Sequence, residues 1–156
     1  MTANHRATLR LLLLCSMTLA FLIVPAYGHV QVSPKESIAG ADERYTMRVP
    51  TEKALPTVRI EAEFPTSVAV SDLESKPGWK IERKMDGSGK ITGATWTGSS
   101  IAPHEVAEFV FHAHNPNQDT KLVWKVIQIY QDGSKSEWTG PEGSRAPAPV
   151  TTIKKK

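Results

Sequence analysis

The sequence predicts an all-β fold, an antiparallel β-sandwich formed by a single domain. From residue 29 onward, short runs of β-branched and aromatic residues alternate with clusters of turn residues, and no amphipathic helix of useful length interrupts them. The chain has 156 residues, which is the size of one ordinary domain. A period of two marks Val106–His114: one face carries Ala107, Phe109, Phe111 and Ala113, and the other carries Glu108, His112 and His114.

Nine strands are predicted, with boundaries set by residues that favour turns. Pro65 and Pro77-Gly78 end strands, whereas Asp86-Gly87 and Asp132-Gly133 suit tight hairpins. In Leu122–Tyr130 both alternations carry apolar residues, which favours a central strand. The predicted strands are Val30–Val32, Arg44–Val49, Thr57–Phe64, Val68–Ser71, Trp79–Arg83, Lys90–Trp96, Val106–His114, Leu122–Tyr130 and Lys135–Trp138.

The first 28 residues have the pattern of a signal peptide. Arg6 and Arg10 give a basic start, residues 11–24 are mostly apolar, and Ala26 and Gly28 place small residues where a signal peptidase cuts. An uncleaved membrane anchor is the alternative, but the apolar run is short for a span of about 20 residues. We therefore expect export to the periplasm or the extracellular space, His29 as the mature N-terminus, and no membrane span after cleavage.

Composition excludes several classes of function. Cys15 is the single cysteine and lies in the predicted signal peptide, so disulfides and thiolate metal sites are excluded from the mature part. Arg6 and Arg10 account for two of the +3 formal charges, which leaves a mature part near +1 and no indication of nucleic-acid binding. Residues 29–140 are expected to form the sandwich, and 141–156, rich in proline and ending in three lysines, a disordered or extended tail.

His29 carries the main functional hypothesis. A histidine at a free N-terminus is a bidentate ligand, because its α-amino nitrogen and its imidazole Nδ1 can close a six-membered chelate on one metal ion. The α-amine has an ordinary pKa of about 7.7 to 8.0, so losing its proton to a metal near neutral pH costs little. Nitrogen donors in a tetragonal arrangement suit Cu(II). The competing interpretation is that His29 is merely the residue that follows the cut.

Strand pairing predicts a carboxylate partner for His29. If Val30–Val32 pairs antiparallel with Arg44–Val49, His29 lies level with the end of the second strand, and Glu52 is the nearest carboxylate. Its oxygen would fill a third position on the metal and offset the charge of the ion. The alternative is that Glu52 is a solvated loop residue.

Five motifs follow one another along the predicted mature part. They are His29–Pro34, Tyr45–Glu52, Pro77-Gly78-Trp79, Ile101 followed by Glu105 and Phe109–Phe111, and Tyr130–Ser134 leading to Glu137–Gly140. With these motifs the chain closely resembles the YcnI-like family of exported copper-binding domains, over nearly the whole mature part. No single motif is decisive, but five in the right order are specific.

The resemblance implies an immunoglobulin-like or cupredoxin-like sandwich that holds one Cu(II) ion by a one-histidine brace, with an acidic residue and a tryptophan nearby. These roles fall on His29, Glu52 and Trp138, with Glu105 as the second choice of acid. Trp138 is expected to pack beside the ion, since its indole N–H is only a donor. The family often has glycine where this chain has His104, which adds a possible imidazole.

The resemblance further implies a non-enzymatic role in copper homeostasis or trafficking, with a copper-transport or copper-chaperone protein as a possible partner. Two other classes remain open. A copper monooxygenase would need a second histidine from His104, His112 or His114, and a metal-free structural sandwich would need no site. His112 and His114 share one strand face and offer a weaker second metal site. The other tryptophans, Trp79, Trp96 and Trp124, are predicted to pack in the core.

Overall fold

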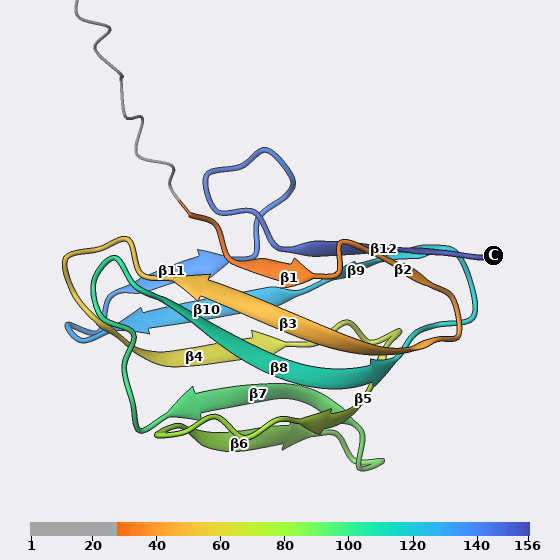
Figure 1. Ribbon diagram of the computed structural model, residues 1–156, viewed down its shortest axis with the longest axis horizontal. Coiled ribbons are helices and arrows are strands. Elements are labelled where there is room, and N and C mark those ends of the chain that lie inside the picture. Colours follow the sequence, from red (N-terminus) through yellow and green to blue (C-terminus); the bar gives the residue numbers. More distant parts are fainter. Residues whose placement is uncertain (1–27) are drawn as a thin grey trace, which may run out of the picture.

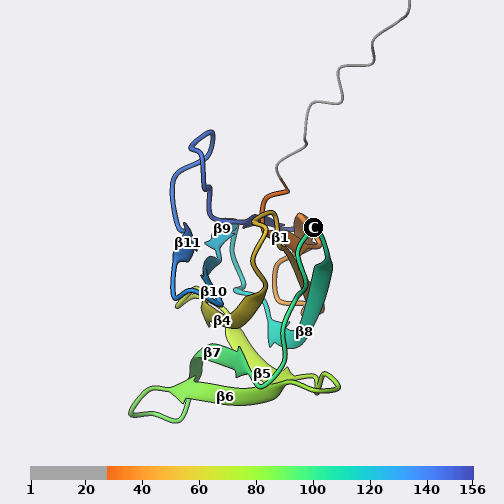
Figure 2. The same ribbon diagram turned by 90° about the vertical axis from the view of Figure 1, so that its left-hand side faces the viewer.

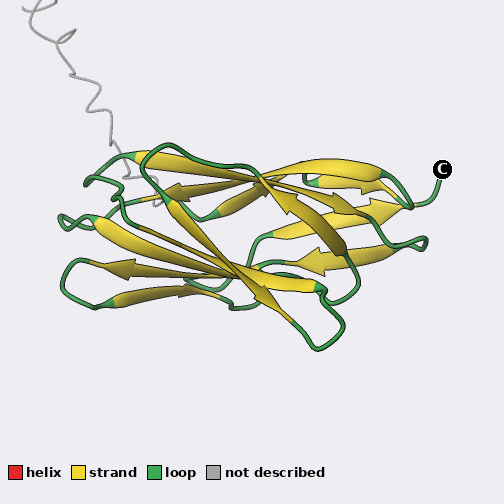
Figure 3. Ribbon diagram, turned by 90° about the horizontal axis from the view of Figure 1, so that it is seen from below, coloured by secondary structure: helices red, strands yellow, loops and turns green. Residues whose placement is uncertain are grey.

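The computed structural model describes residues 28–156, and every regular element in them is a β-strand (Figures 1 and 3). Among these residues, none forms a helix that could cross a membrane. The predicted signal peptide lies outside the described residues except for Gly28. The strands are β1 (Gln31–Ser33), β2 (Glu36–Ile38), β3 (Asp42–Pro50), β4 (Thr57–Glu63), β5 (Ala69–Leu73), β6 (Lys80–Met85), β7 (Ile91–Thr97), β8 (Val106–His114), β9 (Thr120–Val123), β10 (Lys125–Tyr130), β11 (Lys135–Trp138) and β12 (Val150–Lys154).

Two sheets are formed, and the larger one closes over itself to make the sandwich. It has nine strands in the order β1-β3-β8-β5-β7-β4-β10-β11, with β6 added beside β7. Strands β5 and β7 are joined by the single residue pair Val70–Ile91, so the sheet can bend at this point. The strands β1, β3 and β8 then lie against the strands β4, β10 and β11 as a second layer (Figure 2). The smaller sheet is β2-β12-β9. Every pair is antiparallel except β2 with β12, so the prediction of an antiparallel sandwich is confirmed for nearly all the strands.

The core between the layers is rich in aromatic residues. Tyr45 from β3 and Phe111 from β8 both contact Trp124, at centroid distances of 4.9 and 5.3 Å. Trp96 and Trp124 are buried and Trp79 packs partly buried against the core, which confirms the packing role predicted for these tryptophans. The alternation predicted for Val106–His114 is also confirmed, because Phe109, Phe111 and Ala113 are buried whereas His114 is exposed.

The predicted disordered or extended tail at 141–156 contains β12, an ordered strand that the sequence analysis did not predict. This strand pairs with β9 and β2, and it buries Thr151 and Ile153 completely or almost so. Its five residues are Val, Thr, Thr, Ile and Lys, so only Val150 and Ile153 are apolar and no clear alternation marks a strand. Strand β2 was also missed, since three residues are too few to show a period.

Residues Leu122–Tyr130 form two strands rather than the single strand predicted. The break falls at Trp124, whose backbone N–H donates to Pro149 O at 2.9 Å instead of joining the ladder. Here the chain passes from the smaller sheet, in β9, to the larger sheet, in β10. Strand β10 pairs with β4 and β11 on its two sides and is central, as expected.

Candidate metal centre

His29 and Trp138 meet where the two ends of the large sheet come together. His29 precedes β1, the first strand in the sheet order, and Trp138 closes β11, the last. Their ring centroids lie 5.6 Å apart with the planes tilted by 56°. Figure 1 shows β1 and β11 on the same side of the molecule. The sandwich therefore brings together two residues from opposite ends of the described chain.

Glu52 lies beside the backbone that leads into His29. The predicted antiparallel pairing is confirmed, with Gln31 opposite Arg48 and Val32 opposite Met47, which sets His29 level with the end of β3. A Cβ built on Gly28 would lie 3.2 Å from Glu52 Oε1. Gly28, whose carbonyl carbon is bonded to the His29 nitrogen, thus lies beside this carboxylate.

The environment of Glu52 opposes its ionisation. Burial raises the pKa of its carboxyl above the ordinary value, and the nearby charge of His29 acts in the opposite direction and only partly offsets the rise. Tyr130 lies close by: burial raises its phenol pKa, and the negative charge of Glu52 adds to the rise. A cation near Glu52 would relieve the cost of a half-buried carboxylate.

Trp138 presents its ring, not a nitrogen lone pair, to His29. The side chain is 7% exposed, and its indole N–H donates to Gln128 Oε1 at 3.1 Å. His29, in contrast, is exposed and lines an open groove of about 610 Å³ between β1 and the segment 142–150. The imidazole is accessible from this groove, and the indole shields its other side.

His104 and Glu105 approach the site through their backbones. His104 N–H donates to Thr51 O at 2.7 Å, and Thr51 N–H donates to Glu105 O at 2.9 Å. Both side chains are exposed. His104 has a φ of 65°, a left-handed conformation that favours glycine.

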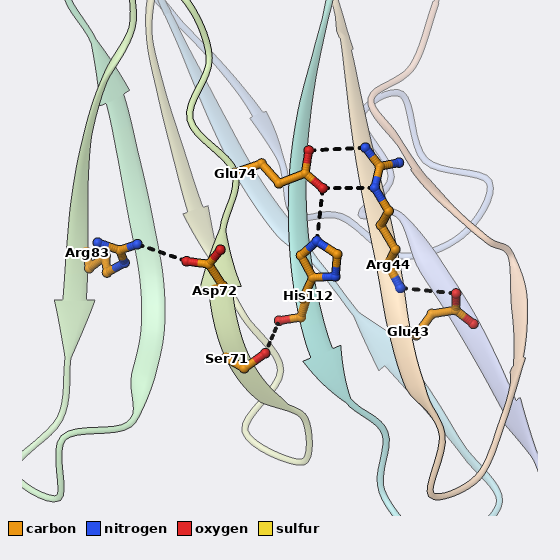
Figure 4. Close-up of polar contacts among 7 residues, drawn as sticks. All are labelled: Glu43, Arg44, Ser71, Asp72, Glu74, Arg83 and His112. Atoms are coloured by element: carbon orange, nitrogen blue, oxygen red, sulfur yellow. Dashed lines mark hydrogen bonds and ion pairs between the residues drawn. The ribbon is translucent and has the colours of Figure 1, made fainter.

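His112 and His114 lie on the outward face of β8 and are already engaged by carboxylates. His112 Nε2 lies 2.9 Å from Glu74 Oε1, and Arg44 binds the same carboxylate, which lowers its pKa (Figure 4). His114 Nδ1 lies 2.9 Å from Asp42 Oδ1. Each histidine therefore has its own carboxylate partner, and no third ligand completes a site between them in residues 28–156.

The donor chemistry at His29 fits Cu(II) only if the N-terminus takes part. In the described part of the chain, no three His, Cys, Asp or Glu side chains gather closely enough to hold a metal ion. His29 and Glu52 supply one imidazole and one carboxylate. An amine on His29 would add a second nitrogen and give the mixed N and O donor set that suits tetragonal Cu(II).

A known family model matches residues 29–153, and its description is "Domain of unknown function (DUF1775)". The chain belongs to the DUF1775 family. The match begins at His29 and includes β12, so the strand missed by sequence reasoning is part of the family domain.

A named relative also matches most of the chain. The chain is 39% identical over 138 residues to copper-binding protein CutI of Bacillus subtilis strain 168, an alignment that covers 87% of this chain and 67% of CutI. CutI is named as a copper-binding protein and not as an enzyme. The resemblance to the YcnI-like family is confirmed by these two matches.

Solved structures show that this DUF1775 domain has an immunoglobulin-like fold. An uncharacterized protein from Nocardia farcinica, described as having that fold, superimposes with a TM-score of 0.72 at 24% identity and covers 81% of this chain and 98% of its own. A cohesin module from a family 33 glycoside hydrolase of Clostridium perfringens gives a TM-score of 0.54 at 11% identity, with 82% and 98% coverage. At these identities the likeness concerns the fold alone.

Sequence reasoning missed two residues that surround the site in this DUF1775 protein. Tyr130 lies near Glu52, and Gln128 binds the indole of Trp138. A signal for Gln128 was present: it is the one polar residue among Leu122, Trp124, Val126 and Tyr130, which occupy the buried alternation of β9 and β10.

Proposed function

We propose that this protein is an exported copper-binding protein of copper homeostasis, and that its site is created by proteolysis after Gly28. The amine and imidazole of His29 and the carboxylate of Glu52 hold one Cu(II) ion, with the Trp138 ring alongside. The observation that carries the proposal is the meeting of His29, Glu52 and Trp138 at one end of the sandwich. The printed name of CutI supports the choice of metal.

The chemistry of this site favours binding and transfer of copper. When bound, Cu(II) would gain two nitrogens from one residue and an oxygen from Glu52, which leaves room for water or for a ligand from another protein. His29 opens onto the groove beside β1, so a copper-transport or copper-chaperone protein could reach the ion from there. The Trp138 indole limits the approach of solvent from the opposite side.

The deciding experiment uses protein secreted from cells, with its first residue identified by mass spectrometry. Protein that begins at His29 should retain one equivalent of Cu(II), and electron paramagnetic resonance should show nitrogen donors. A His29→Ala variant should lose this binding. His114→Ala is the matched control, because this histidine is exposed, is paired with Asp42 of β3, and stands at the end of β8 that is farther along the chain from Glu105.

Two results would contradict the proposal. Equal copper retention by the wild type and His29→Ala would place the metal elsewhere. A mature N-terminus other than His29 would remove the chelating amine. Oxidised sugar products from a copper-loaded, ascorbate-reduced sample would instead support the monooxygenase alternative, for which residues 28–156 offer no group of three His, Cys, Asp or Glu side chains.

A further inference from the structure

Gln128 is a fully buried polar residue in the middle of β10. Its side chain has 0% exposure, and it stands on the same strand face as Val126 and Tyr130. A buried amide without partners is costly, and all the polar atoms of this one are used. Its Nε2 donates to Pro50 O at 2.8 Å and to Thr57 Oγ1 at 2.6 Å, and its Oε1 accepts from Trp138 Nε1 at 3.1 Å.

These hydrogen bonds connect the two segments that form the candidate metal centre, the end of β3 and the end of β11. Pro50 is the last residue of β3 and stands two residues before Glu52. Trp138 is the last residue of β11, in the opposite layer, and packs against His29. A single carboxamide therefore connects the segment that carries the carboxylate to the indole beside the histidine.

We propose that Gln128 is the positioning residue of this site: its carboxamide fixes Trp138 beside His29 and fixes the chain at Pro50–Thr51 that leads to Glu52. The inference rests on the proposed copper site and adds the group that sets its geometry. Gln128 touches no metal itself. It acts through its hydrogen bonds to Pro50, two residues before Glu52, and to Trp138, whose ring lies beside His29.

An amide is the side chain suited to this position. The Pro50 carbonyl needs a donor and the Trp138 indole needs an acceptor, and an uncharged amide supplies both without burying a charge. Thr51 and Thr57 share a hydrogen bond of 2.8 Å between their hydroxyls and complete the network. The backbone of Thr51 is also paired with His104 and Glu105, so the turn before Glu52 is held from two directions.

The test compares Gln128→Met with Asn115→Leu in protein that begins at His29. Both substitutions replace a buried, fully hydrogen-bonded amide by an apolar side chain of similar size. Asn115 binds Tyr45 and Ser37 and follows β8 at the end opposite Glu105, so it lies away from the site. A milder pair is Thr57→Val and Thr151→Val, which each remove one buried hydroxyl. This second pair keeps the test available if the amide variants do not fold.

Two measurements are made on each variant. In metal-free protein, nuclear magnetic resonance follows the Trp138 indole N–H, whose shift and solvent exchange report its hydrogen bond. In a competition titration, the dissociation constant for Cu(II) is measured. We expect Gln128→Met to move the indole resonance, to speed its exchange, and to weaken copper binding by about ten-fold or more, as removal of such supporting partners typically does. Thr57→Val should act in the same direction, and the controls should leave both readings near wild type.

The inference is overturned if Gln128→Met leaves the indole signal and copper affinity at wild-type values, or if Asn115→Leu changes them equally. Failure of the copper proposal looks different. In that case the wild type itself would bind no copper at His29, while the metal-free indole measurement would still show whether Gln128 fixes Trp138.

Discussion

At the scale of single residues, the ionised carboxylate of Glu52 is less stable in the folded protein than in water. Burial raises the pKa of its carboxyl, and the charge of His29 offsets only part of this effect. A carboxyl whose pKa is higher in the folded protein binds its proton more tightly there. Its contribution to stability is therefore present at low pH and is lost as the pH rises toward neutrality.

We predict that Glu52→Gln makes the metal-free protein more stable relative to wild type as the pH rises from about 4, near the ordinary glutamate pKa, to 7. Urea denaturation in the presence of a chelator would measure the free energy of unfolding at each pH. The same variant should bind Cu(II) more weakly. Glu82→Gln, at an exposed position of β6, is the control. A difference from wild type that stays constant with pH would show that burial of the Glu52 charge has no such cost.

At the residue scale, sequence alone predicted the neighbourhood of His29 and Glu52 because it depends on two strands that are near in the chain. The pairing of β1 with β3 needs only the alternation of Val30 and Val32 and a short segment between the strands, which in the structure also contains β2. Trp138 was assigned by resemblance. Gln128 was overlooked, because a single polar residue in an apolar run does not reveal its partners.

At the element scale, β12 is a strand that the amino-acid composition of its segment did not predict. Its outer residues are lysine and threonine, yet Ile153 is 1% exposed and pairs with Thr120 of β9. Thr151 Oγ1 accepts a hydrogen bond from Trp124 Nε1 and donates to Pro34 O. The strand thus covers the point where the chain changes sheets.

Ile153→Ala should lower the free energy of unfolding by about 2 to 5 kcal/mol, the usual range for such a truncation in a packed core. Lys155→Ala, at an exposed neighbour, should change it by less than about 0.5 kcal/mol. Chemical denaturation of both variants gives the comparison. Copper affinity should be unchanged in both, because within residues 28–156 neither side chain forms a hydrogen bond or a ring contact with His29, Glu52 or Trp138, and neither lines the groove beside His29. An Ile153→Ala protein as stable as wild type would mean that the C-terminal strand is dispensable.

At the scale of the whole molecule, the candidate site connects the two ends of the nine-stranded sheet order. His29 extends β1 and Trp138 ends β11, and the chain between them passes through both layers. A metal held by His29 and Glu52 would tie the segment before β1 to the segment after β3. Copper binding should therefore stabilise the entire sandwich and not only a loop.

We predict that Cu(II) raises the melting temperature of the mature protein, with a stabilisation of about 2.7 kcal/mol when free copper is 100 times the dissociation constant. Differential scanning calorimetry over a range of copper concentrations tests this. Protein whose His29 amine has been acetylated is the matched control: it has the same fold and the same imidazole, but the His29 nitrogen is an amide. An equal shift in the control would show that the chelating amine is not used.

The sequence by itself determined the all-β class, most strand positions and the pairing that sets His29 near Glu52. These follow from the period of two, from turn residues and from one short-range pairing, all of which act over a few residues. Only the tertiary structure decided that Trp138 lies against His29, that Gln128 joins the two layers, and that residues 150–154 form a strand. Such contacts depend on which segments, distant in the sequence, bury their apolar surfaces against one another, and a local sequence pattern carries no information about that.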